Sequence, residues 1–356
     1  MSADATLLNP GLPADPAARG EGRRLEPKDY ASDQEVRWCP GCGDYAILKA
    51  VEKALAELGA DPDRTVFVSG IGCAARFPHY LATYGFHGIH GRAPAIATGI
   101  KLARPELDVW VVGGDGDMLA IGTNHLVHAL RRDLDLVILI VNNAIYGLTK
   151  GQASPTTPTG TRTPSTPSGV LERPLSACSL ALAAGARFVA RSVDVHQKQL
   201  PEILVRARRH PGAAMVEILQ NCVIYADGAW AAITEKAHAA EAQLLLRHGE
   251  PLLFADGRKG LAPARDRAGL EVVEVGPEGW QAAGVLVHDE RDRSLATLLA
   301  DLEPPLPVAL GVLYADPAPA SYERLVREQV EAERARAPEL DLAAVIRRAP
   351  TWTVPG

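Results

Sequence analysis

The sequence predicts an α/β fold with a doubly wound, mostly parallel sheet and a C-terminal α/β extension. The first reason is the alternation of short apolar runs with segments of helical period along most of the chain. The second is that glycine or polar residues directly follow the apolar runs, as at 113–117 and 142–143. In an open parallel sheet, these positions lie at the carboxyl ends of strands, where ligands bind.

Two sets of elements make up this alternation. The predicted helices carry apolar residues on one face and lie at 44–58, 93–102, 118–132, 176–184 and 196–209. The predicted strands are apolar runs of buried type at 65–69, 108–112, 136–141, 187–190 and 213–219. Residues 77–92 are predicted to be loop-like. Residues 151–174 are dense in Thr, Pro, Ser and Gly, and an irregular stretch of that length is usually a functional loop.

The chain divides into three predicted parts. Residues 1–35 combine Pro, Gly, Ala and charged residues without an apolar core, so we expect a flexible tail and not a signal peptide. Residues 36–228 hold the alternating pattern and every candidate site residue. Residues 229–356 form the extension. Its predicted helices lie at 230–248, 291–302 and 320–337, and its short strands lie near 271–275 and 307–314.

Composition and charge narrow the possible classes of function. The 356 residues are 47% apolar and carry a net charge of −6, which is typical of a globular chain with a sizeable core. The chain has no basic block, so we expect no nucleic-acid and no membrane partner. No apolar run approaches the length of a transmembrane helix. Five cysteines without an export signal favour a reducing compartment, and we expect a cytoplasmic protein.

An acidic residue and an amide follow two consecutive predicted strands. Asp115 is flanked by glycines directly after one strand, and Asn143 of an Asn-Asn pair follows the next. Oxygen ligands of this kind suit Mg²⁺, which usually keeps phosphate oxygens in its shell. The glycines beside Asp115 leave the backbone open to a phosphate. Gly-Asp-Gly also occurs in turns and calcium loops, but the amide at a second strand end favours a magnesium–diphosphate site.

Four cysteines occupy positions that would suit a metal site. Cys39 and Cys42 flank a Pro-Gly turn before a helix, and Cys73 and Cys222 each follow a predicted strand. A Cys-x-x-Cys pair alone could be a redox pair, half of a zinc site or chance. Two further cysteines at carboxyl strand ends favour a site of four thiolates, either [4Fe–4S] or zinc, over unrelated buried cysteines. Cys178 lies in an Ala/Leu-rich helix and is predicted to be core packing.

Three further residues lie near the rim of the proposed site. His90 is one of ten histidines and is a candidate phosphate contact, although a lone histidine is usually structural. Arg76 closely follows the Cys73 turn, and Lys150 opens the long loop. Each would ordinarily be a solvated surface charge, but their positions would allow both to meet an anionic substrate.

Taken together, these motifs resemble the β chain of the 2-oxoacid:ferredoxin oxidoreductases, which are thiamine diphosphate enzymes. The resemblance covers about residues 38–228 and is collinear. It rests on WCPGCGDYAIL (38–48), GIGC (70–73), FHGIHGR (86–92), ATGIK (97–101), GDGDMLAIGTNH (114–125) and NNAIYGLTKGQASPTT (142–157). The resemblance implies a thiamine diphosphate-binding fold of the diphosphate-domain type. It also favours [4Fe–4S] over zinc.

The resemblance also implies roles for individual residues. The cluster ligands would be Cys39, Cys42, Cys73 and Cys222. Mg²⁺ would be held by Asp115, Asn143 and the backbone carbonyl of Ile145. The thiamine diphosphate would be lined by Ile71, Gly72, Cys73, Ala74, His90, Gly116, Asp117, Gly147 and Leu148. The substrate would meet Arg76, Leu148 and Lys150.

The reaction implied is oxidative decarboxylation of a 2-oxoacid with coenzyme A, giving acyl-CoA and CO₂, with electrons passing through the cluster to ferredoxin. Arg76 and Lys150 offer two cations for a second carboxylate, which favours 2-oxoglutarate over pyruvate. Thiamine enzymes need a Glu against the aminopyrimidine ring, and in this family it belongs to the larger α subunit. We therefore expect no certain catalytic residue in this chain, and an obligate complex with two copies of each subunit.

Three other functions compete with this interpretation. A non-redox thiamine diphosphate decarboxylase or synthase with a structural zinc would share the diphosphate site. A zinc-stabilised scaffold subunit would leave the placement of Asp115 and Asn143 without a purpose. A nicotinamide-dependent dehydrogenase is disfavoured, because the first strand–helix turn lacks the Gly-x-Gly-x-x-Gly spacing.

Overall fold

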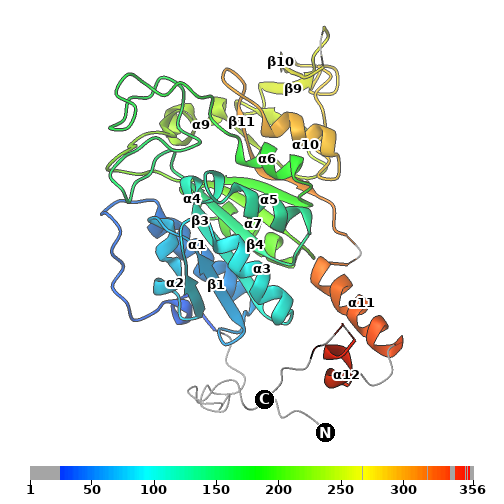
Figure 1. The fold of residues 1–356 in the computed structure, drawn as a ribbon. Helices are drawn as coiled ribbons and strands as arrows, with labels where there is room; N and C mark the ends of the chain where they lie inside the picture. The colour runs from blue at the N-terminus through cyan, green and yellow to red at the C-terminus, as the bar shows by residue number, and fades with distance from the viewer. Residues whose placement is uncertain are drawn as a thin grey trace.

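A sheet of eight strands forms the centre of the protein, as Figure 1 shows for the computed structural model, which describes residues 25–266, 268–318, 320–336, 341–348, 350 and 352. Neighbouring strands are parallel except for β5 and β11, which are antiparallel. The prediction of a mostly parallel sheet is confirmed. In sheet order the strands are β2 (Tyr84–His87), β1 (Thr65–Ser69), β3 (Asp108–Gly114), β4 (Val137–Asn142), β6 (Ala214–Leu219), β5 (Phe188–Val193), β11 (Val308–Ala315) and β7 (Gln243–Leu245).

Helices cover both faces of this sheet. The longer ones are α1 (Asp44–Leu58), α3 (Ala93–Ala103), α5 (Thr123–Arg131), α6 (Ala177–Ala183), α7 (Gln199–Arg209), α10 (Arg293–Ala300) and α11 (Tyr322–Arg336). The shorter ones are η3 (Pro27–Tyr30), η4 (Ala74–Arg76), α2 (Phe77–Tyr80), α4 (Asp115–Leu119), α8 (Ala231–Thr234), α9 (Lys236–Ala242) and α12 (Leu342–Ile346). None of the described helices is both long and apolar enough to span a membrane.

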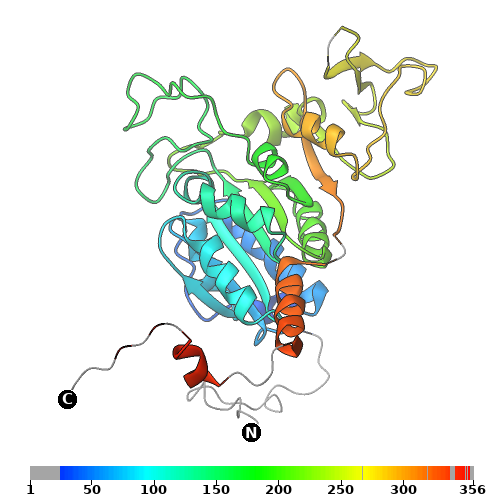
Figure 2. The ribbon, with the colours of Figure 1, turned by 45° about the vertical axis from the view of Figure 1, so that its right-hand side comes forward.

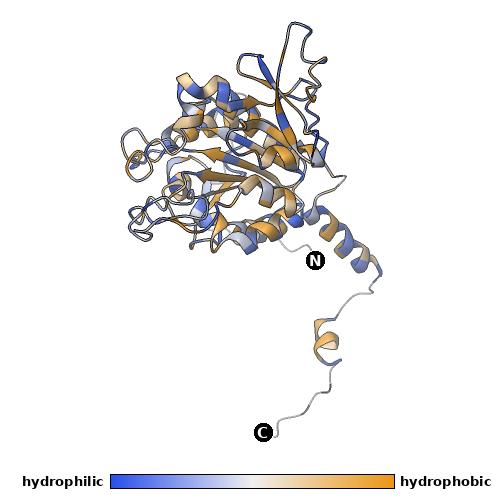
Figure 3. Cartoon of the chain, turned by 90° about the horizontal axis from the view of Figure 1, so that it is seen from above, coloured by the Kyte–Doolittle hydropathy of each residue, from blue (hydrophilic) through white to orange (hydrophobic). Residues whose placement is uncertain are grey.

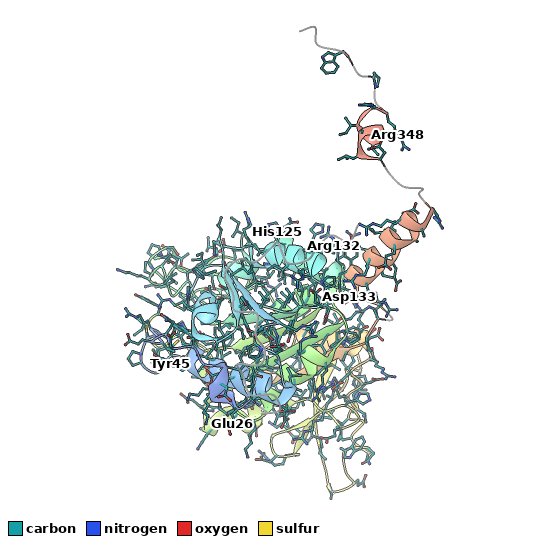
Figure 4. The ribbon with its side chains drawn as sticks, turned by 90° about the horizontal axis from the view of Figure 1, so that it is seen from below. Glu26, Tyr45, His125, Arg132, Asp133 and Arg348 are labelled. Carbon is teal, nitrogen blue, oxygen red and sulfur yellow. The ribbon has the colours of Figure 1, made fainter. Side chains whose placement is uncertain are left out.

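The central strands are buried on both faces, so alternate residues of one strand enter different cores. Val109 and Val111 of β3 pack in a core with α3, α5, α6 and α10, whereas Trp110 and Val112 pack in a second core with α1 and α7. This two-sided burial explains why the strands read as continuous apolar runs. Figure 3 shows the apolar strands enclosed between the helical layers, and Figure 4 shows Tyr45 of α1 and Arg132 after α5 on opposite sides of the molecule.

Two sequence predictions before β4 need correction. Residues 77–92, predicted to be loop-like, contain α2 and the strand β2. β2 is the exposed edge of the sheet, so it lacks the apolar run that marks a buried strand. The single helix predicted over 118–132 is two helices, α4 and α5. The helix is interrupted between Leu119 and Thr123. Gly122 lies in this interruption, where a Cβ would lie 2.4 Å from the Asp117 carbonyl and 3.2 Å from the Gly91 Cα.

The C-terminal extension joins the central sheet. The helix predicted over 230–248 is instead α8, α9 and the strand β7, which pairs with β11. The other predicted elements are found as α10, α11, β10 (Leu270–Glu274) and β11. β10 pairs with β9 (Lys259–Pro263) and β9 with β8 (Leu253–Phe254) in a small sheet near α10 (Figure 2). Two strands from residues 229–356 therefore complete the sheet of residues 36–228.

The N-terminal part begins to pack against the body before residue 36. Residues 1–24 of the predicted tail lie outside the described residues. Tyr30 is fully buried, and its hydroxyl donates to the Ala60 carbonyl at 2.6 Å. Ala31 forms an antiparallel bridge with Leu81. The described end of the predicted tail, residues 25–35, is therefore anchored to the helical layer that carries α1 and α2.

His210, directly after α7, makes the stability of the fold depend on pH. Its ring packs on Phe188, and Nε2 has no hydrogen-bond partner among the described residues. Burial, assisted by the Arg187 charge, lowers the His210 pKa from its usual 6.5 to about 4. Between about pH 4 and 6.5, His210 is therefore protonated in the unfolded chain and neutral in the folded chain. This contribution to stability is complete above pH 6.5 and is lost as the pH falls toward 4.

We expect His210→Gln to remove this acid sensitivity. The wild type should lose up to about 3 kcal/mol through His210 between pH 6.5 and 4, and the variant should not. Thermal unfolding at pH 7 and at pH 5 would measure the difference. Equal losses in the two proteins would show that His210 is not the group responsible.

Candidate functional site

The topology brings four predicted site segments to one edge of the sheet. The strands β1, β3, β4 and β6 are parallel neighbours, so their carboxyl ends lie side by side. Cys73, Asp115, Asn143 and Cys222 each come shortly after one of these ends. The crevice outside the carboxyl ends of an open parallel sheet is the usual place for a ligand.

A cavity of about 330 Å³ lies at this edge. It is lined by all nine predicted cofactor residues and by the three predicted Mg²⁺ ligands Asp115, Asn143 and Ile145. Tyr146 and Gln152 also line it; both lie in the 142–157 motif, but neither is among the predicted site residues. Tyr146 stacks its ring so close to Gly116 that a Cβ there would lie 2.2 Å from the ring, and its hydroxyl donates to the Gly116 carbonyl. We call this space the diphosphate cavity.

Asp115 is a buried carboxylate at the floor of the diphosphate cavity. It is 1% exposed, and its Oδ2 accepts hydrogen bonds from Ser154 Oγ and Thr156 Oγ1, both at 2.5 Å. Burial raises the Asp115 pKa to about 6, although these hydroxyls act in the opposite direction. A nearby cation would favour the ionised form. On the neighbouring turn, Asn143 Oδ1 accepts from the Ile145 N–H at 3.1 Å, which draws the amide and Ile145 together.

Asp117 ties three segments of the cavity wall together. Its Oδ1 accepts from the backbone N–H groups of Ile71 at 3.1 Å and Gly91 at 2.8 Å, and lies 2.6 Å from His90 Nδ1. At Gly70, a Cβ would lie 2.2 Å from the same carboxylate, which explains the glycine. His90 thus lies close to a buried acid and lines the cavity, near the rim position that the sequence predicted for it.

The four predicted cluster cysteines line a second cavity, of about 240 Å³, which we call the thiol cavity. The Pro40-Gly41 turn, closed by the Cys42 N–H on the Cys39 carbonyl, places the first two. The other two sulfurs, of Cys73 and Cys222, both lie within 4 Å of the position that a Cβ on Gly147 would take. Cys178 is fully buried elsewhere, in the core that α6 helps to form, and belongs to that helix.

Burial raises the pKa of two of these thiols, those of Cys42 and Cys73. Burial raises the Cys73 pKa to about 11, and the neighbouring Asp44 and Cys222 add to the effect. The Cys42 pKa is raised for the same reasons, burial first and then Asp44. Bringing several anionic sulfurs together is unfavourable unless positive charge lies between them. The donor set therefore fits a multivalent iron centre, because metal ligation keeps thiols deprotonated.

The arrangement of the thiols bears on the choice between zinc and iron–sulfur. Among the described residues, no group of three or more His, Cys, Asp or Glu side chains is arranged to hold a metal ion. A single zinc ion draws four sulfurs to within about 3.8 Å of one another, given bonds of about 2.3 Å. A four-iron cluster keeps its ligands farther apart, because an iron–sulfide core stands between them. Metal and sulfide analysis distinguishes the two cases, because a cluster brings inorganic sulfide and a zinc ion does not.

The two cavities adjoin. Cys73, Asn143, Gly147 and Leu148 line both of them. Arg76 and Lys150, the predicted substrate cations, line the thiol cavity and are not among the residues of the diphosphate cavity. Arg76 Nη1 donates to the Arg37 carbonyl at 2.8 Å, which directs the guanidinium to the segment before Cys39. Leu148 is partly exposed between the two spaces.

Comparison with known proteins identifies the family of the chain. Residues 70–218 match the family described as thiamine pyrophosphate enzyme, C-terminal TPP binding domain. The chain is 47% identical to 2-oxoglutarate oxidoreductase subunit KorB of Mycobacterium tuberculosis over 354 residues, 98% of this chain and 93% of that protein. It is 53% identical to 2-oxoacid:ferredoxin oxidoreductase 1, subunit beta, of Aeropyrum pernix over 198 residues, 56% of this chain and 62% of that one.

A solved structure extends the comparison to the fold. The 2-oxoglutarate:ferredoxin oxidoreductase from Magnetococcus marinus, with 2-oxoglutarate, coenzyme A and succinyl-CoA bound, aligns with a TM-score of 0.73 and 31% identity. The alignment covers 93% of this chain and 98% of that chain. With these matches, and with the predicted motifs gathered at one sheet edge, the chain belongs to the 2-oxoacid:ferredoxin oxidoreductase family, among its β subunits.

Proposed function

We propose that this chain is the subunit of a 2-oxoglutarate:ferredoxin oxidoreductase that holds thiamine diphosphate, Mg²⁺ and a [4Fe–4S] cluster. The single observation that carries the proposal is the pair of adjoining cavities. One is lined by a buried carboxylate and amide, the other by four thiols, and Cys73 lies on the wall between them. An electron donor and an electron acceptor would be neighbours in such a site.

The residues of the diphosphate cavity fit a metal-bound diphosphate. Because both hydroxyls hold Oδ2 of Asp115, we assign Oδ1 to the cation. Asn143 Oδ1 and the Ile145 carbonyl supply two further oxygens, and Mg²⁺ prefers oxygen ligands. Gly72 has a positive φ of 134°, and a Cβ there would meet no atom within 4 Å. It therefore leaves open the space next to Cys73 that a cofactor would fill.

The chemistry divides between the groups that would be bound and the residues that hold them. When bound, thiamine diphosphate supplies a carbanion for the 2-oxo carbon, and an iron–sulfur cluster accepts single electrons. Asp115, Asn143 and Ile145 orient the diphosphate end, and Asp117 keeps His90 beside it. Cys39, Cys42, Cys73 and Cys222 hold the cluster. The cavity walls keep the two groups adjacent.

The chain supplies one half of a thiamine diphosphate site. The family match covers only the C-terminal TPP binding domain type, and the described cavity has no glutamate among its lining residues. We therefore place the activating glutamate on a larger α subunit, in a complex with two copies of each chain. Coenzyme A and the 2-oxoacid are the substrates of this complex, and ferredoxin accepts the electrons.

Copurification with the α subunit tests the proposal. The complex should contain about four iron atoms and four sulfides per β chain, gain thermal stability from thiamine diphosphate with Mg²⁺, and reduce ferredoxin with 2-oxoglutarate and coenzyme A. The β chain alone should be inactive. Zinc in place of iron would indicate the non-redox alternative. Faster turnover of pyruvate than of 2-oxoglutarate would contradict the assignment of 2-oxoglutarate as the substrate.

We expect Arg76→Ala and Lys150→Ala to raise KM for 2-oxoglutarate by about tenfold and to change KM for pyruvate little. Each removes a charge-assisted contact, worth about 1.5–3 kcal/mol, to the second carboxylate that only 2-oxoglutarate carries. Steady-state kinetics of the complex with both substrates would measure this. Arg162→Ala, an exposed cation of the same long loop, is the control and should match the wild type.

Equal effects on the two substrates would contradict the assignment. Because Arg76 and Lys150 line the thiol cavity, that result would mean that they serve the anionic cluster and not the substrate. A shift of the cluster potential in the variants would then accompany the change in rate.

A further inference from the structure

The long loop over 151–174 folds back onto the diphosphate cavity. No helix or strand lies between β4 and α6, yet Ser154, Thr156 and Thr157 are all buried. These residues belong to the run Ser-Pro-Thr-Thr, which supplies three hydroxyls within four positions. A buried hydroxyl needs a partner, and the partners here are the elements of the metal site.

Two of the hydroxyls converge on one oxygen. Ser154 Oγ and Thr156 Oγ1 each lie 2.5 Å from Asp115 Oδ2. Hydrogen bonds to a charged acceptor are short and about twice as strong as neutral ones. A carboxylate rotates about a single torsion, so two donors on Oδ2 define where Oδ1 lies. The loop thereby sets the oxygen that we assign to the cation.

The third hydroxyl fixes the other side of the metal site. Thr157 Oγ1 accepts from the Ser154 N–H and donates to the Ala144 carbonyl, both at 2.7 Å. Ala144 has a positive φ of 57°, which is strained for a residue with a side chain and needs support. The next carbonyl along the chain is that of Ile145, the backbone ligand. Thr157 thus holds the turn that presents it.

Asn142, the first residue of the Asn-Asn pair, anchors this arrangement to the sheet. Its Oδ1 lies 2.8 Å from Thr156 Oγ1 and accepts from the Ala144 N–H, while its Nδ2 donates to Glu217 Oε1 at 2.8 Å. Glu217 is buried and paired with Arg191 at 2.7 Å. The Arg191 charge, acting against burial, lowers the Glu217 pKa, so the carboxylate stays ionised and can only accept. The Asn142 amide therefore has a single favourable orientation.

We infer that Ser154, Thr156 and Thr157 form a hydroxyl clamp that positions Asp115 and the 143–145 turn for Mg²⁺. The inference rests on the proposed function, since it describes how that site is made ready for its metal. In this interpretation, the irregular loop supplies side chains that hold the metal ligands without binding the metal themselves. The loop follows those ligands in the chain. Such outer partners orient ligands and commonly account for 10–100-fold in metal affinity.

The test is a titration of Mg²⁺ in the α/β complex at fixed thiamine diphosphate, read as thermal stabilisation. We expect Thr156→Val to raise the half-saturating Mg²⁺ concentration by about 10–100-fold. Thr156→Ser keeps the hydroxyl and should restore affinity to within a few-fold of wild type. Iron content should be unchanged, because none of the three hydroxyl residues lines the thiol cavity. If Thr156→Val fails to fold, Ser154→Ala removes the other donor to Oδ2 with a smaller change in shape.

Thr163→Val separates positioning from loop order. Thr163 is a similarly buried threonine of the same loop, and its hydroxyl bonds within the loop to Ser165 and Thr166. It should titrate with Mg²⁺ like the wild type. An equal shift in the Thr156 and Thr163 variants, or no shift in Thr156→Val, would overturn the clamp. No response of the wild type to Mg²⁺ would overturn the proposed function and the clamp with it.

Discussion

Asp115→Asn is expected to abolish the stabilisation that thiamine diphosphate and Mg²⁺ together confer on the complex, and to lower turnover by more than about 100-fold. The substitution preserves shape but removes the charge of the only carboxylate among the three predicted metal ligands. Mg²⁺ sheds water reluctantly and depends on anionic oxygens to hold it. Loss of an inner ligand should therefore exceed the 10–100-fold effect typical of outer partners.

The measurement is a thermal shift of the complex with cofactor and metal added singly and together. Asp108→Asn is the matched control, since Asp108 begins the strand β3 that Asp115 follows and pairs with Arg208 at the opposite end of the sheet. That variant should lose some stability and keep its full response to Mg²⁺. Normal Mg²⁺-dependent stabilisation of Asp115→Asn would exclude Asp115 as the metal ligand.

Cys73→Ser is expected to remove the iron–sulfur cluster and with it the reduction of ferredoxin. Cys73 lies on the wall shared by the two cavities, and the other three thiols cannot close a four-ligand site without it. Iron and acid-labile sulfide, with the visible absorbance of thiolate-bound iron, would measure the loss. Thermal stability should fall as well, because metal binding contributes to folding.

Cys178→Ala provides the control for that experiment. Cys178 is the fifth cysteine, fully buried within α6 with its sulfur 3.3 Å from Glu217 Oε2. Its removal should lower stability modestly and leave the iron content unchanged. Full iron content in Cys73→Ser, or loss of iron in Cys178→Ala, would refute the assignment of the ligands.

The core of the fold follows from local patterns in the sequence. A parallel sheet covered by helices on both faces needs strands that are apolar at every position, and 108–112 and 136–141 have that composition. The site residues follow from the same rule. Glycines, acids, amides and cysteines just after such runs must lie at the carboxyl edge, so Cys73, Asp115 and Asn143 could be grouped without coordinates.

Elements that depend on a distant partner could not be predicted in this way. β2 has no buried face, and β7 is a strand only because it pairs with β11. Neither segment therefore shows the pattern of apolar residues by which a strand can be predicted from its own sequence. The break between α4 and α5 arises from the close approach of Gly91 to Gly122. Helical propensity alone predicts one continuous helix across this break.

The order of residues and the direction of the strands are enough to predict which side chains meet at the edge of the sheet. How those side chains are held depends on contacts that form only in the folded protein. The hydroxyls of Ser154 and Thr156 reach Asp115 across about forty residues of chain, and Arg76 and Lys150 line the thiol cavity and not the diphosphate cavity. Contacts between irregular segments leave no periodic pattern in the sequence, because they form only when the whole chain is folded. They could therefore not be predicted from local patterns.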